Sequence, residues 1–432
     1  MRILHSKFYI LNSNKRYFRV PNGATATILL LLLILSGCKK RQVPIPIPQM
    51  DTDPQFWVRV LLLDDIKTCT LKIESSFSII DDPNLNTQLP TARFDQIESP
   101  MNIQLVNGQI TIGGRPFMND EVVVYPDEPY MFNLDGQYYR GKLKLLINPE
   151  SGSFDAINLV PPEAYLAGVV GAEMPDHWEP EALKAQAIAA RTYCLYIKKR
   201  FGTNRKWDIR KTAAHQVYRG VRAESAEIWN SVNQTKGQVL VCTQTDDTED
   251  IFPTYYSSIC GGHTENSINV FGDSFEPLTG VDCPYCRKVA KPKFFFWPKI
   301  EFDNTYVVRR LLQRYPNLKQ LGKIINIEPE LPSNYKDFSR LTKIKLLGSN
   351  GKSDILRAED FRLAIDPTGR KLKSTIFQIV KRGDKWEFSS GRGWGHGVGM
   401  CQCGAQGMAR KGQKAKKILT YYYPGSKIIS IY

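Results

Sequence analysis

The chain has 432 residues, of which 42% are hydrophobic and 11% aromatic. These values are typical of globular proteins and exclude a disordered or low-complexity chain, and the length suffices for two or three domains. The formal net charge of +15 indicates an anionic partner, which could be a polymer or a membrane surface.

The first 37 residues have the pattern of a lipoprotein-type signal peptide. Residues 2–19 are rich in Lys and Arg and contain no acid, and an apolar run follows over residues 28–35. This run is too short to cross a bilayer as a helix of ~20 residues. It ends in "LSGC", which resembles a bacterial lipobox, so we expect Cys38 to be lipidated. The alternative is an uncleaved signal anchor.

Export narrows the choice of partner. Nucleic acid is the usual partner of a strongly basic protein, but an exported protein rarely meets it. We therefore expect an anionic envelope polymer or membrane surface, with the protein facing the periplasm or the cell wall, and no nucleic acid. Residues 38–55 contain "VPIPIP", and Pro-rich segments favour extended spacers. We interpret them as the tether to the membrane.

Residues 56–160 are predicted to form a β-rich N-terminal subdomain. Runs such as "FWVRVLLL", "EVVVYP" and "FDAINLV" are rich in β-branched and aromatic residues. Turn signals that include "NG" and "DG" separate these runs, as in hairpins. No cluster of catalytic residue types stands out in this region.

Residues 161–432 read as a mixed α/β region, so the predicted fold class is α+β. Pro180 suits the first turn of a helix that Gly202 ends. A second helix should precede Gly237, with the strand "QVLVC" after it. A further α/β segment is expected over residues 294–385, and "QKAKKILTYYYPG" is predicted to close the chain as a last helix.

An acid in "VVGAEMP" is the first candidate for chemistry. We expect Glu173 to lie in a short apolar loop bounded by Gly171 and Pro175, where poor solvation raises a carboxyl pKa and suits a general acid. On the helix that follows, Lys184 and Arg191 share one face. By pattern alone, these residues also fit an ordinary loop acid and a solvated helix face.

Four residues have a spacing that resembles a zinc site: Cys260, His263, Cys283 and Cys286. Disulfides are the alternative, with equal weight, because exported proteins meet an oxidising compartment. His396, Cys401 and Cys403 are another possible ligand group, although the pair Cys401 and Cys403 is too close for the usual C-x2–4-C spacing. This pair is also a candidate for a stabilising site together with Cys283 and Cys286. A structural zinc ion therefore stays an option, and we expect no cofactor to be required for catalysis.

The stretch "GRGWGHGVGMCQCGAQGMA" alternates glycine with other residues from Gly391 to Gly399. Neither the dinucleotide-binding nor the P-loop pattern fits this spacing. Alternation with period two predicts an extended segment with one bare side, which a ligand or another backbone can approach closely. His396 within it is either a polar contact for a ligand or a buried structural histidine.

Three segments together resemble the stage II sporulation protein D family, which includes amidase enhancers. They are "EAYLAGVVGAEMPDHWEPEALKAQAIAARTY", "YYSSICGGHTEN" and "GRGWGHGVGMCQCGAQGMARKG", in the order typical of the family. The segment "DFRLAIDPTGRKLKSTIF" fits as well, and the similarity covers residues 139–432. Many relatives have serine and tryptophan where this chain has Cys401 and Cys403.

The resemblance implies a lytic transglycosylase that acts on peptidoglycan strands stripped of their stem peptides. Such an enzyme cuts between N-acetylmuramic acid and N-acetylglucosamine and leaves a 1,6-anhydro end. The family's catalytic glutamate matches Glu173. Residues in the matching motifs are candidates for glycan binding: Lys184, Gln186, Arg191, Ser257, His396 and Gln402. Some relatives bind zinc through cysteines before "QVY", but here "DIRKTAAHQVY" has only His215, so that site is not carried over.

A lytic transglycosylase needs one carboxyl group that works twice. Protonated Glu173 would donate to the glycosidic oxygen, and its carboxylate would then accept the proton of the muramic acid 6-hydroxyl. A hydrolase usually needs two carboxylates, and acids at 176, 179 and 181 leave that option open. The main alternative is a non-catalytic, glycan-binding activator of an N-acetylmuramoyl-L-alanine amidase, in which Glu173 would be dispensable.

Cations beside Glu173 would lower its pKa and leave it ionised. We therefore expect at least one of Lys184 and Arg191 to face the substrate instead. Arg191 would clamp the lactyl carboxylate of a muramic acid, a bidentate contact that lysine makes less well. His396 and Gln402 are expected to face Glu173 across a glycine-lined glycan cleft.

Overall fold

The N-terminal part of the chain is built of strands, as its short β-branched runs predict. The computed structural model describes residues 51, 54, 56–81, 91–95, 100–202, 204–243 and 247–432. The predicted signal peptide, Cys38 and most of the predicted tether lie outside these residues. No helix within the described part of the chain is long and apolar enough to cross a membrane.

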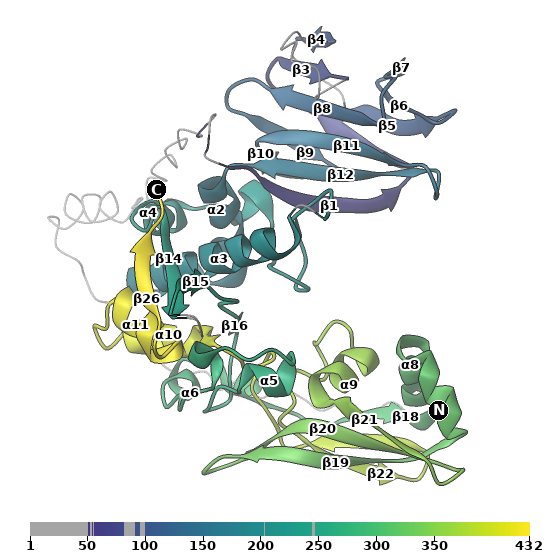
Figure 1. The fold of residues 1–432 in the computed structure, drawn as a ribbon, viewed down its shortest axis with the longest axis vertical. Coiled ribbons are helices and arrows are strands. Elements are labelled where there is room, and N and C mark those ends of the chain that lie inside the picture. The colour runs from purple at the N-terminus through teal and green to yellow at the C-terminus, as the bar shows by residue number, and fades with distance from the viewer. Residues whose placement is uncertain are drawn as a thin grey trace, which may run out of the picture. The chain divides into compact units, whose positions relative to one another are not determined.

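Two sheets share one hydrophobic core in this part (Figure 1). The seven-stranded sheet has the order β13 (Ile209–Arg210), β1 (Val58–Ile66), β12 (Ser153–Val160), β11 (Lys142–Asn148), β8 (Glu121–Pro126), β3 (Phe77–Ile80) and β4 (Ala92–Phe94). The six-stranded sheet has the order β10 (Gln137–Arg140), β9 (Met131–Leu134), β2 (Thr68–Lys72), β5 (Met101–Val106), β6 (Gln109–Ile112) and β7 (Arg115–Pro116). Buried residues alternate along β3 and β9, because one face of each strand meets the core.

Helix α3 (Pro180–Phe201) lies at the centre of the next region. Pro180 occupies its first turn and Gly202 its C-cap, which confirms both predicted ends. Its alanine-rich surface is buried and lets neighbouring elements approach closely. These neighbours are α2 (Pro162–Glu173), α4 (Ala226–Asn233), β14 (Gln238–Thr243), β15 (Glu249–Ile251), α10 (Gln402–Ala409) and α11 (Ala415–Tyr422).

The chain closes on a strand, not on the helix that the sequence predicts. Helix α11 forms where it was expected, but β26 (Lys427–Ser430) follows it and pairs antiparallel with β14. The partners Gln238 and Ser430 mark one end of this pairing. The residues after Gly425 could not be recognised as a strand from their own short pattern, because β14, which they complete, lies far away in sequence.

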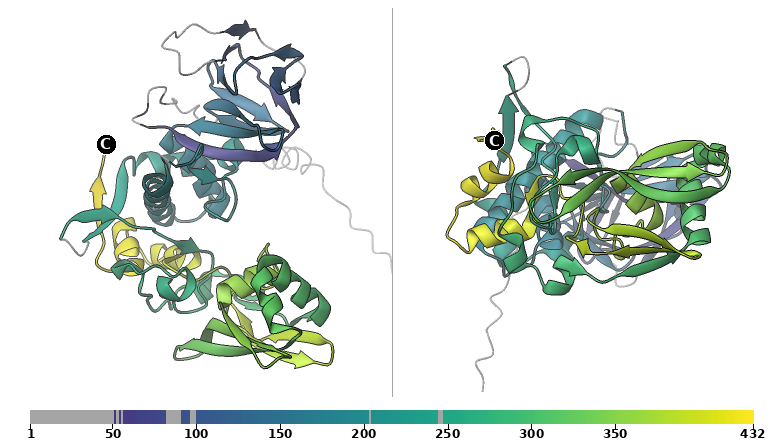
Figure 2. Two further views of the ribbon diagram at one scale, coloured as in Figure 1. Left: turned by 45° about the vertical axis from the view of Figure 1, so that its right-hand side comes forward. Right: turned by 90° about the horizontal axis from the view of Figure 1, so that it is seen from below.

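A segment within residues 296–392 has a hydrophobic core of its own, which includes Trp297, Ile344 and Phe388. Helices α8 and α9 lie on one face of its strands (Figure 1 and Figure 2). Its elements are β17 (Phe296–Trp297), β18 (Ile300–Asp303), α8 (Asn304–Arg314), η3 (Pro316–Leu321), β19 (Ile324–Asn334), β20 (Ser339–Gly348), β21 (Ser353–Arg357), α9 (Ala358–Ile365), β22 (Gln378–Arg382), β23 (Lys385–Ser389) and β24 (Gly391–Arg392).

The 3-10 helix η1 (Gly220–Ala223) packs on α2 and β10. Other short elements lie in the chain between the α3 region and this segment or directly after the segment. They are β16 (Tyr256–Ser257), α5 (Ser267–Val270), η2 (Glu276–Leu278), α6 (Cys286–Val289), α7 (Pro292–Phe295) and β25 (Met400–Cys401). Strands β16 and β25 pair in parallel, with Ser257 beside Cys401. This pairing brings two of the sequence motifs together. The fold is α+β, as predicted.

Candidate active site

Glu173 is the last residue of helix α2, whereas the sequence suggested a loop. The helix tolerates Gly171 in its last turn and ends because Pro175 follows. A residue before proline is pushed into the extended region, and Met174 has φ −128° and ψ 143°. Glu173 therefore lies at a helix end that is held by the core, and the residue keeps some exposed surface.

Two groups donate hydrogen bonds to the Glu173 carboxylate. The backbone N–H of Val217 contacts Oε1 at 3.1 Å, and Gln402 Nε2 contacts Oε2 at 3.3 Å. Burial raises the pKa of Glu173, while these two donors and the positive charge of Arg219 lower it. Burial prevails, so the pKa of Glu173 is raised, as a general acid requires. Other carboxyl groups of the described chain have lowered pKa values instead, among them Asp65, Glu74, Glu181, Glu359 and Asp366.

Glycines in α2 bring the 217–223 segment close to Glu173. A Cβ at Gly168 would lie 2.4 Å from the Tyr218 ring, and a Cβ at Gly171 would lie 1.9 Å from the Ala223 carbonyl oxygen. Helix α2 packs directly on η1 at this place. The glycines of "LAGVVGAE" thus allow the approach that places the Val217 N–H against the carboxylate.

We expect Gly171→Ala to destabilise the protein by about 1–3 kcal/mol, the usual cost of overpacking. Alanine would by itself favour a helix by about 1 kcal/mol, so a net loss measures the collision with Ala223. Urea denaturation would give the change in free energy of unfolding. Unchanged or increased stability would show that α2 and η1 are not in tight contact.

Buried hydrogen bonds hold the Val217 segment from behind. Tyr165 Oη donates to Gln216 Oε1 at 3.0 Å, and Gln216 Nε2 donates to Tyr256 Oη at 3.0 Å and to the Ala190 carbonyl at 3.1 Å. The charge of Glu173 contributes to the raised pKa of Tyr256, which places the two groups near each other. Neither this network nor Arg219 was recognised from the sequence, although the segment "QVYRG" contains Gln216, Val217 and Arg219.

Arg191 does not face a ligand, and this part of the sequence prediction is wrong. Its side chain is 1% exposed and pairs with Glu163, with 3.1 Å between Arg191 Nε and Glu163 Oε1. It also donates to the Gln238 carbonyl at 3.1 Å. Arg191 therefore joins α3 to α2 and β14. Because its guanidinium group is buried and bound by these partners, Arg191 cannot also bind a lactyl carboxylate.

Lys184 is partly exposed and pairs with Glu181, with 3.0 Å between Nζ and Oε1. It lines a hollow of ≈ 400 Å³ with Gln234, Thr235 and Gln238 among its other walls. Neither Lys184 nor Arg191 contributes to the pKa shift of Glu173; the cation that does is Arg219. The prediction that at least one of these two cations faces the substrate therefore fails for Arg191 and stays a prediction for Lys184.

Comparison with known proteins shows the family to which the chain belongs. The profile of the stage II sporulation protein family, SpoIID, matches residues 150–242. Stage II sporulation protein D of Bacillus subtilis is 30% identical over 63% of this chain and 76% of its own length. The chain belongs to the SpoIID family.

Two further relatives extend the match. An uncharacterised protein of Brachyspira hyodysenteriae is 33% identical over 69% of this chain and 74% of its own length. The amidase enhancer of Bacillus subtilis is 27% identical over 76% of this chain, which spans 50% of that longer relative. All of these matches reach well beyond the profile match.

The glycine stretch of this SpoIID-family chain packs against the protein itself. Gly393, Gly395, Gly397 and Gly399 have φ between 67° and 103°, a region that disfavours other residues. A Cβ at Gly399 would lie 2.0 Å from the Tyr255 carbonyl oxygen, and one at Gly393 2.8 Å from that of Ile259. The predicted close approach of another backbone is therefore confirmed, and the predicted ligand-facing wall is wrong. The bare side accommodates residues 255–261.

His396 is held by backbone groups. Its Nε2 lies 2.9 Å from the Tyr256 carbonyl oxygen, and its Nδ1 accepts from the Val398 N–H at 3.1 Å. Burial lowers the pKa of His396 to about 4, so the ring is neutral at physiological pH. Both ring nitrogens bind backbone groups, so His396 fits the alternative of a structural histidine. It does not fit the predicted role of a polar contact that faces Glu173.

The structure places the three other predicted glycan contacts, Gln402, Gln186 and Ser257, in different surroundings. Gln402 reaches Glu173, as described above. Gln186 is fully buried, and neither polar atom of its side chain has a hydrogen-bond partner within the described chain. Ser257 is 6% exposed, with an unpartnered hydroxyl. Neither of the last two reaches the surface as a glycan contact would require.

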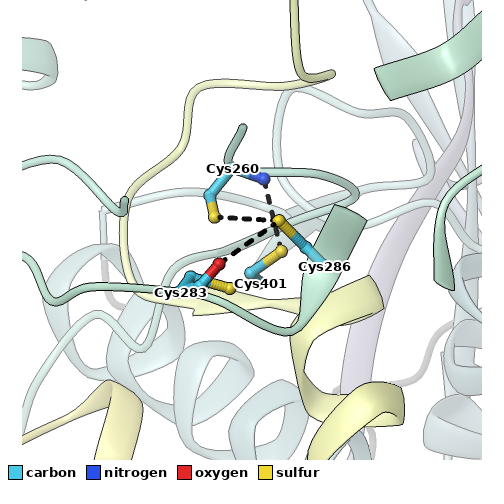
Figure 3. Close-up of side chains that lie close together, drawn as sticks. All are labelled: Cys260, Cys283, Cys286 and Cys401. Carbon is cyan, nitrogen blue, oxygen red and sulfur yellow. Dashed lines mark hydrogen bonds between the residues drawn. The ribbon is translucent and has the colours of Figure 1, made fainter. Parts of the chain in front are cut away.

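The cysteine motifs converge on one buried cluster (Figure 3). Cys260, Cys283 and Cys286 come together as their spacing suggested, but the fourth member is Cys401 and not His263. His263 instead stacks on Tyr335 with ring centroids 4.1 Å apart, and its Nδ1 lies 2.6 Å from the Thr264 carbonyl oxygen. The expectation that His263 is a ligand is therefore wrong.

Proposed function

We propose that this SpoIID-family protein is a peptidoglycan lytic transglycosylase that acts on peptide-denuded glycan strands. The observation that carries the proposal is Glu173. Glu173 is a partly exposed residue at the end of a helix; burial raises the pKa of its carboxyl group, and two donors bind that group. These are the properties of a group that must hold a proton at neutral pH and later accept one.

The proposed reaction uses the carboxyl group of Glu173 twice. The protonated form gives its proton to the glycosidic oxygen as the bond to C1 of N-acetylmuramic acid breaks. The resulting carboxylate takes the proton of the 6-hydroxyl, whose oxygen bonds to C1 and closes the 1,6-anhydro ring. Val217 N–H and Gln402 stabilise the carboxylate between these steps, and no water is consumed.

The nearby acids favour this reaction over hydrolysis by paired carboxylates. The charged group that shifts the pKa of Glu173 is the cation Arg219, and not a second carboxylate. Glu181 is bound by Lys184 and by the Ala415 N–H at 2.8 Å. Asp176 lies 3.7 Å from the His177 ring nitrogen in an exposed pair. An inverting or retaining hydrolase would need one of these groups opposite Glu173.

Product analysis tests the proposal. Residues 39–432 would be incubated with denuded glycan strands, and the products identified by mass spectrometry. We expect 1,6-anhydro-muramic acid ends, which are lighter by one water than hydrolytic ends. Reducing ends would show a hydrolase and overturn the proposed mechanism.

One finding favours a second function. A relative that covers 76% of this chain is named amidase enhancer, so the protein could bind glycan and stimulate an N-acetylmuramoyl-L-alanine amidase. In the same assay, absence of cleavage together with faster stem-peptide release by an added amidase would support this alternative. With either activity, we propose that the protein works at the cell wall. We also propose that it is an exported lipoprotein anchored through Cys38.

The contact of Gln402 with Glu173 gives a pH test. Its amide donor stabilises the ionised carboxylate and so lowers the pKa. In Gln402→Leu we expect the pKa of Glu173 to rise further, so the basic limb of the pH–kcat/KM profile moves to higher pH. Since Gln402 also stabilises the carboxylate intermediate, kcat should fall by about 10-fold.

Gln406→Leu is the matched control. Gln406 lies on the same helix face, one turn further along, and accepts from the Glu179 N–H at 2.9 Å. This variant should keep the basic limb of wild type. Equal shifts in both variants would mean that general disturbance of α10, and not the bond to Glu173, moves the profile.

A further inference from the structure

Four cysteine sulfurs face one another in the interior. Cys260, Cys283, Cys286 and Cys401 are all buried, and their Sγ atoms lie within 4.8 Å of one another. Figure 3 shows the four side chains converging from different backbone segments. Cys260 follows strand β16, Cys283 and Cys286 flank the turn into α6, and Cys401 ends β25.

The separations fit a single tetrahedral metal ion. Zinc–sulfur bonds of about 2.3 Å at tetrahedral angles place neighbouring sulfurs about 3.8 Å apart. Cys260 Sγ and Cys286 Sγ are 3.8 Å apart. A disulfide needs about 2.05 Å, and no disulfide is formed among the described cysteines. The short spacing leaves room for one ion and not for a larger iron–sulfur cluster.

The surroundings of the sulfurs also suit thiolates. The Cys260 N–H donates to Cys401 Sγ at 3.2 Å, and Tyr422 Oη lies 3.1 Å from Cys283 Sγ. Such outer contacts orient metal ligands. Arg340 donates to the Cys260 carbonyl at 2.6 Å, and Arg392 donates to the carbonyl of the next residue, Gly261. Two guanidinium groups thus lie beside the turn that carries Cys260.

A glycine makes space for this arrangement. A Cβ at Gly404 would lie 1.9 Å from Tyr422 Oη and 2.7 Å from Cys283 Sγ. The first turn of α10 therefore comes close enough for Cys401 to complete the cluster and for Tyr422 to reach Cys283. Cys403 is buried close by, but it is not one of the four converging residues.

We propose that these four cysteines bind one structural zinc ion. Four thiols lose their protons to solvent as the ion binds, and the four thiolates with Zn²⁺ carry a net charge of −2. A set of four thiolates at tetrahedral spacing is the donor set that zinc takes in closed structural sites. The proposal does not depend on the catalytic activity of Glu173.

The ion would fix the residue that contacts Glu173. Cys401 is the N-cap of α10, and Gln402 is the first residue of that helix. Zinc would thus join the 260 turn, the 283–286 turn and the start of α10, with Gln402 Nε2 held 3.3 Å from Glu173 Oε2. In this scheme the metal is structural, and Gln402 is the positioning residue it supports.

Metal analysis of purified residues 39–432 tests the site. We expect one zinc ion per chain in native mass spectrometry and elemental analysis, and X-ray absorption should show four sulfur ligands at about 2.3 Å. Cys283→Ser should lower zinc affinity by at least the roughly 10–100-fold that loss of an outer-shell partner costs. Cys403→Ser, a buried thiol next to the site, should retain one zinc ion.

Several outcomes would overturn the proposal. One is metal-free wild type with a Cys260–Cys286 disulfide in peptide mapping without reduction. Another is iron in place of zinc at the same stoichiometry, and a third is loss of zinc in Cys403→Ser but not in Cys401→Ser. If Cys283→Ser does not fold, Tyr422→Phe keeps all four ligands and should weaken zinc binding about 10-fold. X-ray absorption of the wild-type protein tests the four sulfur ligands without any variant.

Discussion

Glu173→Gln is expected to lower kcat on denuded glycan by about 10³-fold, the middle of the range for loss of a general acid and base. The amide has nearly the shape of the carboxyl group, and its oxygen can still accept a hydrogen bond from the Val217 N–H. It can neither release a proton to the glycosidic oxygen nor accept one from the 6-hydroxyl. Release of 1,6-anhydro ends, quantified by mass spectrometry, gives the rates.

Glu179→Gln is the matched control. Glu179 is exposed, six residues further along the chain, and its contact to Gln406 is made by its backbone N–H. This variant should cleave glycan at the wild-type rate. If Glu173→Gln kept full activity, Glu173 would not be the acid. If both wild type and variant were inactive but stimulated an amidase, the activator function would replace the proposed one.

Arg191→Met should destabilise the protein by about 3–5 kcal/mol, since it leaves the Glu163 carboxylate without its partner in a mostly buried site. The Glu163 side chain is 14% exposed and that of Arg191 1%, so little water can take the place of the lost guanidinium. Tyr432 Oη still donates to Glu163 at 2.6 Å, which offsets a small part of the loss. Equilibrium urea denaturation measures the change in free energy of unfolding.

The double variant Arg191→Met, Glu163→Gln should recover part of this stability, because it removes the isolated charge. Lys199→Met provides the exposed comparison. Lys199 pairs with Asp250 at the surface, with exposed fractions of 63% and 40%, and such pairs contribute about 1 kcal/mol or less. An equally small effect for Arg191→Met would indicate that Arg191 is free in solution, which would restore a role in binding substrate.

Local patterns predicted much of the fold. The short β-branched runs before residue 160 form strands, and Pro180 and Gly202 mark the two ends of α3. The expected helix and strand around Gly237 appear as α4 and β14. Propensities and caps act within one or two turns of the chain, so these elements could be recognised without knowing what they pack against.

Motif recognition also found Glu173, Gln402 and the four clustered cysteines, although it grouped Cys401 with Cys403 and gave the place beside Cys260 to His263. It failed where a side chain had two plausible partners. Arg191 looked like a ligand contact, but Glu163 and the Gln238 carbonyl bind it in the interior. His263 had suitable zinc spacing, but Cys401, 141 residues from Cys260, completes the cluster through the β16–β25 pairing.

The sequence by itself determined the α+β class, the SpoIID-family motifs and the acid that is the best candidate for catalysis. Only the tertiary structure decided that the glycine stretch packs on residues 255–261 and that His396 binds backbone groups. It also decided that Val217 and Gln402 bind the carboxylate of Glu173. Hydrogen bonds, ion pairs and close backbone contacts between distant segments depend on positions that no local pattern encodes. Which of several polar residues meets a ligand is therefore settled only when the chain has folded.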